Sequence, residues 1–159
     1  MSKNEKKSIS WKWITITIIV LASVFGMIAA LYQASPIGPT PSKKIIINYK
    51  YTTMDSVGSW EADAGTTLLI FNMTIENHGY DRFYVNPLDF EAVVDNVVYS
   101  HSIITYFLDD VGYIPMQQVY VLDGGKLVCA ISFEIPKNYQ SVSLGLKWTT
   151  GYNIEWVSA

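Results

Sequence analysis

An uninterrupted apolar run near the N-terminus constrains this chain of 159 residues more than any other feature. The run extends from Ile14 to Tyr32 and contains no charged side chain. At a helical rise of about 1.5 Å per residue it spans about 28 Å, close to the roughly 30 Å hydrocarbon core of a bilayer. The sequence therefore predicts one transmembrane helix at residues 14–32, preceded by a short basic tail at residues 1–13.

The charges on the two sides of this run predict its orientation. The tail carries four lysines and one glutamate, whereas the part from Gln33 onward carries seven basic and thirteen acidic residues. Cytoplasmic flanks of membrane helices are enriched in lysine and arginine, so we expect the tail in the cytoplasm and the C-terminal part outside. Trp11 and Trp13 at the inner boundary and Tyr32 at the outer one are predicted membrane-interface anchors, because aromatic rings favour the headgroup layer.

A cleaved leader peptide is the alternative to a retained anchor. Signal peptides have a shorter apolar region, roughly 7 to 15 residues, that ends in a small-x-small cleavage site. Here Tyr32 spoils the site ending at Ala34, and Ile28 spoils the one ending at Ala30. The sequence favours an uncleaved signal anchor. Gly26 and Ala30 form a small-xxx-small pair that would let another helix approach closely, although ordinary small residues in a membrane helix also explain them.

The remainder of the chain predicts one all-β domain behind a spacer. Residues 33–44 hold three prolines and favour an extended, semi-rigid spacer. Residues 45–159 match the size of one domain and contain short alternating runs of β-branched and aromatic residues, separated by turn residues. The Asp95-Asn96 pair between two valine pairs suits a two-residue hairpin turn. We expect an immunoglobulin-like antiparallel β-sandwich.

Four finer expectations concern individual segments. Residues 90–94 should resume the strand that Pro87 interrupts, and residues 103–107 should form a further strand of a sheet. Residues 109–112 are predicted as a loop. Trp60 is expected to cap one end of the core.

Few side chains offer metal or catalytic chemistry. His78, His101 and Cys129 are the only histidines and cysteine in the chain, and they lack zinc spacing. No histidine follows Cys129, as a blue-copper site would require, and the Asp109-Asp110 pair lacks a ligand-spaced partner for calcium. Because no serine stands in a nucleophile motif either, we expect no cofactor, no metal and no enzymatic activity.

Two features point to the surface of the predicted domain. Asn72 begins the only N-x-S/T sequon and is a candidate N-glycosylation site on the face opposite Phe71 and Met73. The domain also has more aromatic residues than one small core should bury, and tyrosine-rich surfaces favour recognition, although tyrosine also suits strands. A protein or glycan partner is therefore expected. The acidic balance argues against nucleic acid.

Three stretches resemble a known family: residues 68–79, LLIFNMTIENHG; residues 85–99, VNPLDFEAVVDNVVY; and residues 122–136, LDGGKLVCAISFEIP. They are similar to a family of exported bacterial and archaeal domains of unknown function with a telokin-like, immunoglobulin-type fold. The resemblance implies one such domain joined to a signal peptide, lipoprotein anchor or membrane helix, and it implies no catalytic residue. The chain departs from the family at Gly124-Gly125, where a single glycine is more usual.

Together these patterns predict a non-enzymatic binding domain at the cell surface. We expect a single-pass protein of the cell membrane, held in the lipid bilayer by residues 14–32, with an extracytoplasmic C-terminal domain. A pilin-like filament subunit and an accessory subunit of a membrane complex are the alternatives. Lys12, just before the apolar run, argues against the pilin.

Overall fold

Strands predominate in the computed structural model, which describes residues 42–158. The predicted anchor helix, with Trp11, Trp13, Gly26, Ala30 and Tyr32, lies outside the described residues. Within residues 42–158, no helix is long and apolar enough to cross a bilayer. The elements are β1 (Lys44–Met54), β2 (Ser56–Val57), β3 (Trp60–Glu61), β4 (Thr66–His78), β5 (Arg82–Val85), η1 (Pro87–Asp89), β6 (Phe90–Val94), β7 (Val97–Ser100), η2 (Ile103–Val111), β8 (Val119–Leu122), β9 (Lys126–Pro136), β10 (Val142–Leu146) and β11 (Ile154–Ser158).

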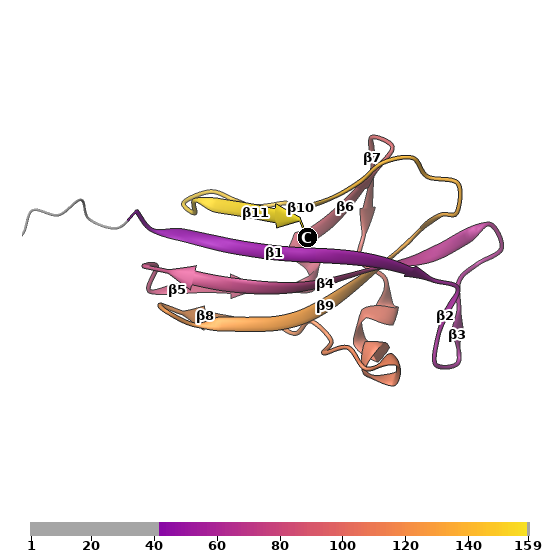
Figure 1. Ribbon diagram of the computed structural model, residues 1–159, viewed down its shortest axis with the longest axis horizontal. Coiled ribbons are helices and arrows are strands. Elements are labelled where there is room, and N and C mark those ends of the chain that lie inside the picture. The colour runs from indigo at the N-terminus through magenta and orange to yellow at the C-terminus, as the bar shows by residue number, and fades with distance from the viewer. Residues whose placement is uncertain (1–41, 159) are drawn as a thin grey trace, which may run out of the picture. The chain divides into compact units, whose positions relative to one another are not determined.

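The first layer is a four-stranded sheet in the order β11-β1-β4-β9 (Figure 1). β4 is its longest strand and pairs antiparallel with β1 on one side and β9 on the other, as its regular alternation predicts. The inward residues of β1, Ile45 and Ile47, are fully buried. These alternating residues therefore form the core-facing side of β1.

One pairing in this layer differs from the expected antiparallel arrangement. β11 runs parallel to β1, with Ile45 opposite Ile154 and Tyr49 opposite Ser158. A parallel pair needs a long crossover between its strands, and here the whole of the domain lies between β1 and β11. The first and last strands of the domain are consequently neighbours.

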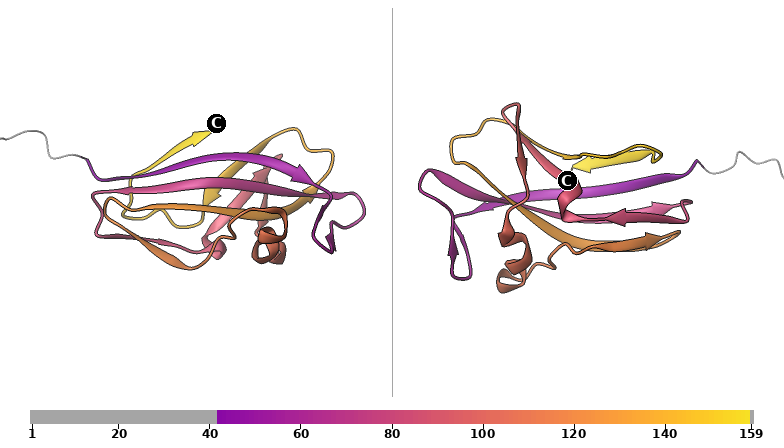
Figure 2. Two further views of the ribbon diagram at one scale, coloured as in Figure 1. Left: turned by 60° about the horizontal axis from the view of Figure 1, so that its bottom comes forward. Right: turned by 180° about the vertical axis from the view of Figure 1, so that it is seen from behind.

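The second layer contains the sheet β10-β6-β7 and the two-stranded ladder β5-β8 (Figure 2). β6 therefore does not resume β5, contrary to the expectation, because the two strands belong to different sheets. The reason lies at Asn86, whose side chain accepts a hydrogen bond from the Leu88 amide at 3.1 Å and caps the short helix η1. This turn redirects the chain before β6 begins.

The main core fills the space between the two layers. Phe71 of β4 makes an edge-to-face contact with Phe133 of β9, with ring centroids 5.8 Å apart. From the second layer, Phe90, Ala92 and Leu144 enter the same cluster. Both layers are thus joined by one continuous apolar interior, which defines an all-β sandwich.

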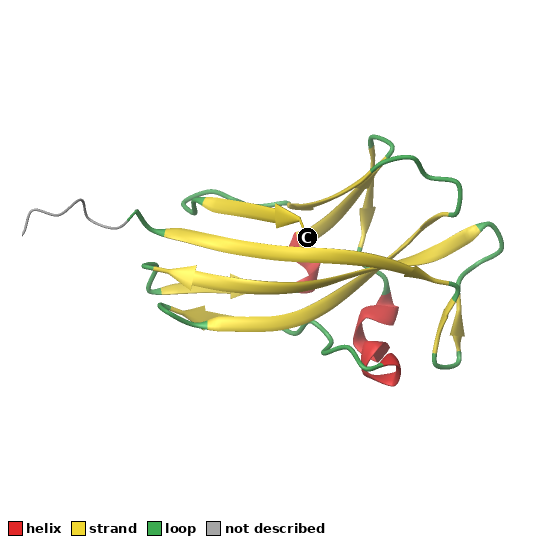
Figure 3. Cartoon of the chain, viewed as in Figure 1, coloured by secondary structure: helices red, strands yellow, loops and turns green. Residues whose placement is uncertain are grey.

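Residues 103–111 form the 3-10 helix η2 rather than the predicted strand and loop (Figure 3). Ser102 caps the start of η2 by accepting from the Ile104 amide, and Gly112 ends it with a φ of 83°. η2 lies on the outer face of the four-stranded sheet, where Ile104 and Leu108 cover Leu68 and other residues in a second apolar cluster. Capping residues at both ends outweighed the strand-like composition of this segment.

A buried hydroxyl pair, formed by Thr105 of η2 and Ser132 of β9 with their oxygens 3.2 Å apart, attaches η2 to the edge of β9. The Thr105 hydroxyl oxygen accepts from the Ser132 amide at 3.0 Å, and the Ser102 amide donates to the Ser132 carbonyl oxygen at 2.7 Å. Farther along β9, the Ala130 amide donates to the carbonyl oxygen of Ile114 at 2.7 Å. Residues 102–116 therefore cover part of an edge that would otherwise offer free backbone groups.

The turns of the sandwich follow the predicted chemistry. Asp95 and Asn96 have φ values of 48° and 67°, as a type I′ hairpin between β6 and β7 requires. The Asp95 carboxylate also accepts hydrogen bonds from the Gln140 and Ser141 amides, at 3.1 and 2.8 Å, ahead of β10. These amide donors hold the pKa of Asp95 below its ordinary value.

A buried asparagine connects two turns at the end of the sandwich where β1 begins. Asn77 is fully buried, and its side-chain amide donates to the carbonyl oxygens of Tyr80 and Val121, both at 2.8 Å. Its side-chain oxygen accepts from the Tyr80 amide at 3.1 Å. The β4–β5 turn and the end of β8 are thereby fixed to each other.

Trp60 does not cap the core, because its side chain is 42% exposed and lies outside both apolar clusters. Residues 56–61 form the small hairpin β2-β3, which carries Trp60. Its ring lies against Phe107 of η2, with centroids 5.1 Å apart. Trp60 therefore belongs to the surface formed by this hairpin and η2.

Candidate binding face on the four-stranded sheet

The outer face of the four-stranded sheet is divided into a covered half and an open half. In the covered half, Leu68, Ile70 and Ala130 are buried beneath η2 and the β2-β3 hairpin. Farther along the same strands, the outward positions carry polar side chains that neither element covers. The open half is the candidate binding face, and we call it the polar face.

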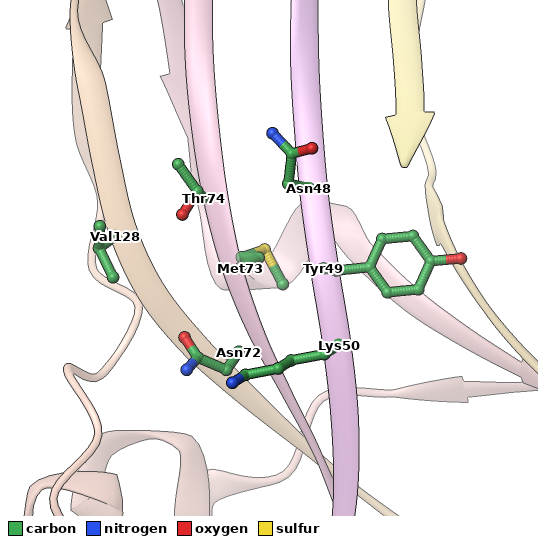
Figure 4. Close-up of a pocket in the computed structure, with 7 residues that line it drawn as sticks. All are labelled: Asn48, Tyr49, Lys50, Asn72, Met73, Thr74 and Val128. Carbon is green, nitrogen blue, oxygen red and sulfur yellow. The ribbon is translucent and has the colours of Figure 1, made fainter. Parts of the chain in front are cut away.

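Strand register brings the polar side chains together. Asn48 of β1 lies opposite Thr74 of β4, which lies opposite Val128 of β9. In the next row, Lys50 lies opposite Asn72. Figure 4 shows these five side chains on one side of the sheet, with the nitrogen of Lys50 directed toward Asn72.

Two adjoining hollows occupy the polar face. The first has a volume of about 300 Å³ and is floored by the core residues Tyr49 and Met73 between the polar rows. The second has a volume of about 220 Å³ and lies toward η2, between Thr52 and Tyr113. Lys50 and Asn72 line both hollows, so the two adjoin at these residues, and we call them together the depression.

Lys50 differs from the other basic residues of the described part of the chain. Six of the seven basic side chains in residues 42–158 lie near a carboxylate or over a tyrosine ring, namely Lys43, Lys44, Arg82, Lys126, Lys137 and Lys147. Lys50 has neither kind of partner within these residues. No acidic residue lines either hollow, so the depression carries a local positive charge in an acidic domain.

A charged cluster borders the polar face next to Thr74. The Glu76 carboxylate lies 3.0 Å from the Lys126 ammonium and 3.3 Å from the His78 ring. The hydrogen bond from Lys126, and then the one from His78, hold the pKa of Glu76 below its ordinary value. The negative charge nearest to the hollows along β4 is therefore largely neutralised.

The sequon residue Asn72 lies on the polar face, as predicted from the strand alternation. Phe71 and Met73 point into the core on the opposite side, and the Asn72 side chain is half-buried between Lys50 and Ala130. A glycan attached to Asn72 would fill the depression. N-glycosylation of Asn72 stays a prediction.

His78 borders this face in the cluster with Glu76, and the other candidate metal-binding and nucleophilic side chains do not line its hollows. Cys129 is buried in the core, and burial raises the pKa of its thiol to about 12. Desolvation, and then the nearby positive charge of Lys147, lower the pKa of His101. Asp109 and Asp110 lie in the last turn of η2. Within residues 42–158, no group of three or more histidine, cysteine or acidic side chains is placed to hold a metal ion.

The surplus of aromatic residues is distributed between core and surface. Phe83 is buried, whereas Tyr84 and Tyr120 stand on the outer side of the β5-β8 ladder with ring centroids 5.0 Å apart. The Arg82 guanidinium lies 5.5 Å from the Tyr120 ring centre. Phe107 and Trp60 form a second exposed aromatic pair.

Sequence reasoning did not identify Asn48 or Lys50 as site residues. A usable signal was present, since asparagine is disfavoured inside strands and occurs in the middle of both β1 and β4. The missing information was the register that places Lys50 opposite Asn72. No pattern within a single strand contains it.

The fold places this part of the chain among all-β sandwich domains with an exposed polar sheet face. The chain belongs to the family described as domain of unknown function DUF4352, whose model matches residues 42–153. No curated protein and no solved structure matches the chain. This membership agrees with the part of the resemblance that points to a family of domains of unknown function.

Proposed function

We propose that this protein is a non-enzymatic binding domain held at the outer surface of the cell membrane by one N-terminal helix. The apolar run at residues 14–32 would span the bilayer with the basic tail in the cytoplasm. The sandwich would then stand outside, at a distance set by the proline-rich residues 33–44.

We further propose that the sandwich has an immunoglobulin-like topology. Support comes from the sheet order β11-β1-β4-β9 facing β10-β6-β7, with strands distant in the chain as neighbours. Such crossed connections between two layers are typical of immunoglobulin-type sandwiches. The parallel pairing of β1 with β11 is an addition to the antiparallel pattern.

The observation that carries the binding function is the polar face. Hollows of about 300 and 220 Å³ adjoin on this face and share Lys50 and Asn72. Concave surfaces with a few convergent polar groups are the usual ligand sites of proteins. The polar face meets this requirement with two hollows that share a lysine and an asparagine.

Two variants with matched charge test the membrane anchor. Val20→Arg together with Leu21→Arg places two charges inside the apolar run, at a cost of about 2.5–3.5 kcal/mol each at the bilayer centre. Ser8→Arg together with Ser10→Arg adds the same charges to the tail. After an alkaline carbonate wash, the native chain and the tail variant should remain in the membrane pellet, and the Val20/Leu21 variant should leave it.

Orientation is tested by adding protease to spheroplasts that express the full chain. A C-terminal epitope should be lost and an N-terminal epitope should be protected until the membrane is permeabilised. Release of the native chain by carbonate, or protection of the C-terminal epitope in intact spheroplasts, would contradict the proposal.

A further inference from the structure

We propose that the polar face binds an acidic glycan, a saccharide chain bearing carboxylate groups, with Lys50 pairing with one carboxylate. This inference rests on the proposed function, because a domain outside the membrane is exposed to extracellular saccharide chains. It goes further by naming the ligand class and the residues that contact it.

The hydrogen-bonding groups of the polar face match those of a sugar. Each hydroxyl of a sugar can donate and accept a hydrogen bond. The amides of Asn48 and Asn72 offer both donors and an acceptor, and the hydroxyls of Thr52 and Thr74 do the same. A row of groups with this dual capacity can adapt to successive hydroxyls along a chain.

The shape of the depression suits a short linear ligand. It follows β1 from Asn48 to Thr52, four residues along the strand, which corresponds to roughly 13 Å at about 3.3 Å per residue. Apolar surface flanks it, with Val128 at the first hollow and the Tyr113 ring at the second. These side chains can cover the apolar C–H faces of sugar rings while the amides hold the hydroxyls.

Charge selects an acidic glycan over a neutral one. Lys50 is the basic residue without an anionic or aromatic partner in residues 42–158, and the depression contains no acidic side chain. The adjoining Glu76 is paired with Lys126 at 3.0 Å and so repels an approaching carboxylate less. Only a ligand anion would give the Lys50 ammonium a partner of opposite charge at this site.

A protein partner fits this face less well. Protein interfaces are usually centred on large aromatic or arginine side chains, whereas the two hollows share a lysine and an asparagine, and the Tyr113 ring lines only the second hollow. The exposed aromatic pairs of the domain lie elsewhere, at Trp60 with Phe107 and at Tyr84 with Tyr120. Nucleic acid would require several basic residues in one patch, whereas a single lysine lines the depression.

The test measures binding of a fluorescein-labelled oligogalacturonate to the full chain reconstituted in nanodiscs, followed by fluorescence anisotropy. Empty nanodiscs give the background. A cello-oligosaccharide of equal length is the neutral probe, and inorganic phosphate is added as a competitor. Binding in nanodiscs does not depend on which side of the cell membrane the domain faces. The binding assay and the orientation assay can therefore fail independently of each other.

Three variants locate the binding. Lys50→Gln removes the ammonium with little change in volume, and Asn72→Asp places a repelling carboxylate in the depression. Each should weaken binding of the oligogalacturonate at least about tenfold, as expected for loss of a charge-assisted hydrogen bond. Lys137→Gln makes the same charge change at an exposed lysine outside the depression and should bind as the native chain does. Unchanged near-ultraviolet circular dichroism and melting temperature confirm that the variants fold.

Saturable binding of the acidic probe, at least about tenfold tighter than that of the neutral one and weakened by added salt, would support the proposal. Four results would overturn it: no saturable binding, equal binding of both probes, full affinity in Lys50→Gln, or displacement by phosphate at equal concentration. A fifth contradicting result would come from intact-mass analysis of the native protein. A mass showing a glycan attached to Asn72 would overturn the proposal, because that glycan would occupy the depression.

Discussion

Replacement of Asn77 by alanine should destabilise the domain by about 3 kcal/mol, because this side chain supports two turns from a fully buried position. Its amide donates to the carbonyl oxygens of Tyr80 and Val121 at 2.8 Å, and its oxygen accepts from the Tyr80 amide at 3.1 Å. Alanine leaves three backbone groups without this partner, and each costs about 1 kcal/mol or more.

The expected loss is large enough to measure by thermal unfolding of the full chain. An unfolding entropy of about 2.1 cal/mol/K per residue gives about 0.25 kcal/mol/K for a domain of this size, so the melting temperature should fall by about 12 °C. Asn138→Ala alters an exposed asparagine in a turn and should change the stability by less than about 0.5 kcal/mol.

Asn77→Asp separates hydrogen bonding from side-chain volume. Aspartate has nearly the same size, but its ionised form has no donor for the carbonyl oxygens of Tyr80 and Val121. At neutral pH it should melt below Asn77→Ala, and the gap should narrow as acid protonates the carboxyl group and restores one donor. A fall of less than about 4 °C in Asn77→Ala would refute the reasoning, since it corresponds to about 1 kcal/mol.

Three further predictions concern single side chains. Because the folded pKa of Asp95 lies below its ordinary value of 3.8, its stabilising effect should be complete above that value and disappear as pH falls through the folded pKa. The melting temperature of the native chain should therefore exceed that of Asp95→Asn at neutral pH, by a margin that shrinks in acid; a margin independent of pH would contradict this. The Cys129 thiol should resist iodoacetamide at about pH 8 until the chain is unfolded, as mass spectrometry can verify, since its pKa is about 12; rapid labelling of the native chain would disprove its burial. Thr105→Val keeps the side-chain volume but leaves the Ser132 amide without its acceptor, which should cost about 1–3 kcal/mol and speed hydrogen exchange in residues 102–116 relative to β1. Equal rates of hydrogen exchange in the native chain and in Thr105→Val would show that the hydroxyl pair does not hold η2 in place.

Local patterns predicted the parts of the fold that depend on local chemistry. The alternating runs of β-branched and aromatic residues predicted strands, and the three long strands β1, β4 and β9 contain such runs. The Asp95-Asn96 pair gave the hairpin between β6 and β7, because a type I′ turn needs residues that tolerate positive φ.

Local patterns did not predict which strands pair when they are distant in the sequence. The alternation in β1 shows which side faces the core, but it does not say that β11, from the other end of the domain, pairs with it in parallel. The same limit hid the polar face, because Asn48, Lys50 and Asn72 become neighbours only through the β1–β4 register. η2 was not predicted for another reason: residues 103–107 have strand-like composition, whereas Ser102 and Gly112 cap a helix over residues 103–111.

The adjacency of β1 and β11 has a consequence for how the domain resists stretching. The two terminal strands lie side by side and run in the same direction (Figure 1), so tension between the start of β1 and the end of β11 acts along the strands. Their hydrogen bonds then bear the load together in shear, and they must break almost simultaneously. An antiparallel terminal pair pulled at adjacent ends would instead open one bond at a time. The domain should therefore resist stretching between its termini more strongly than its size suggests.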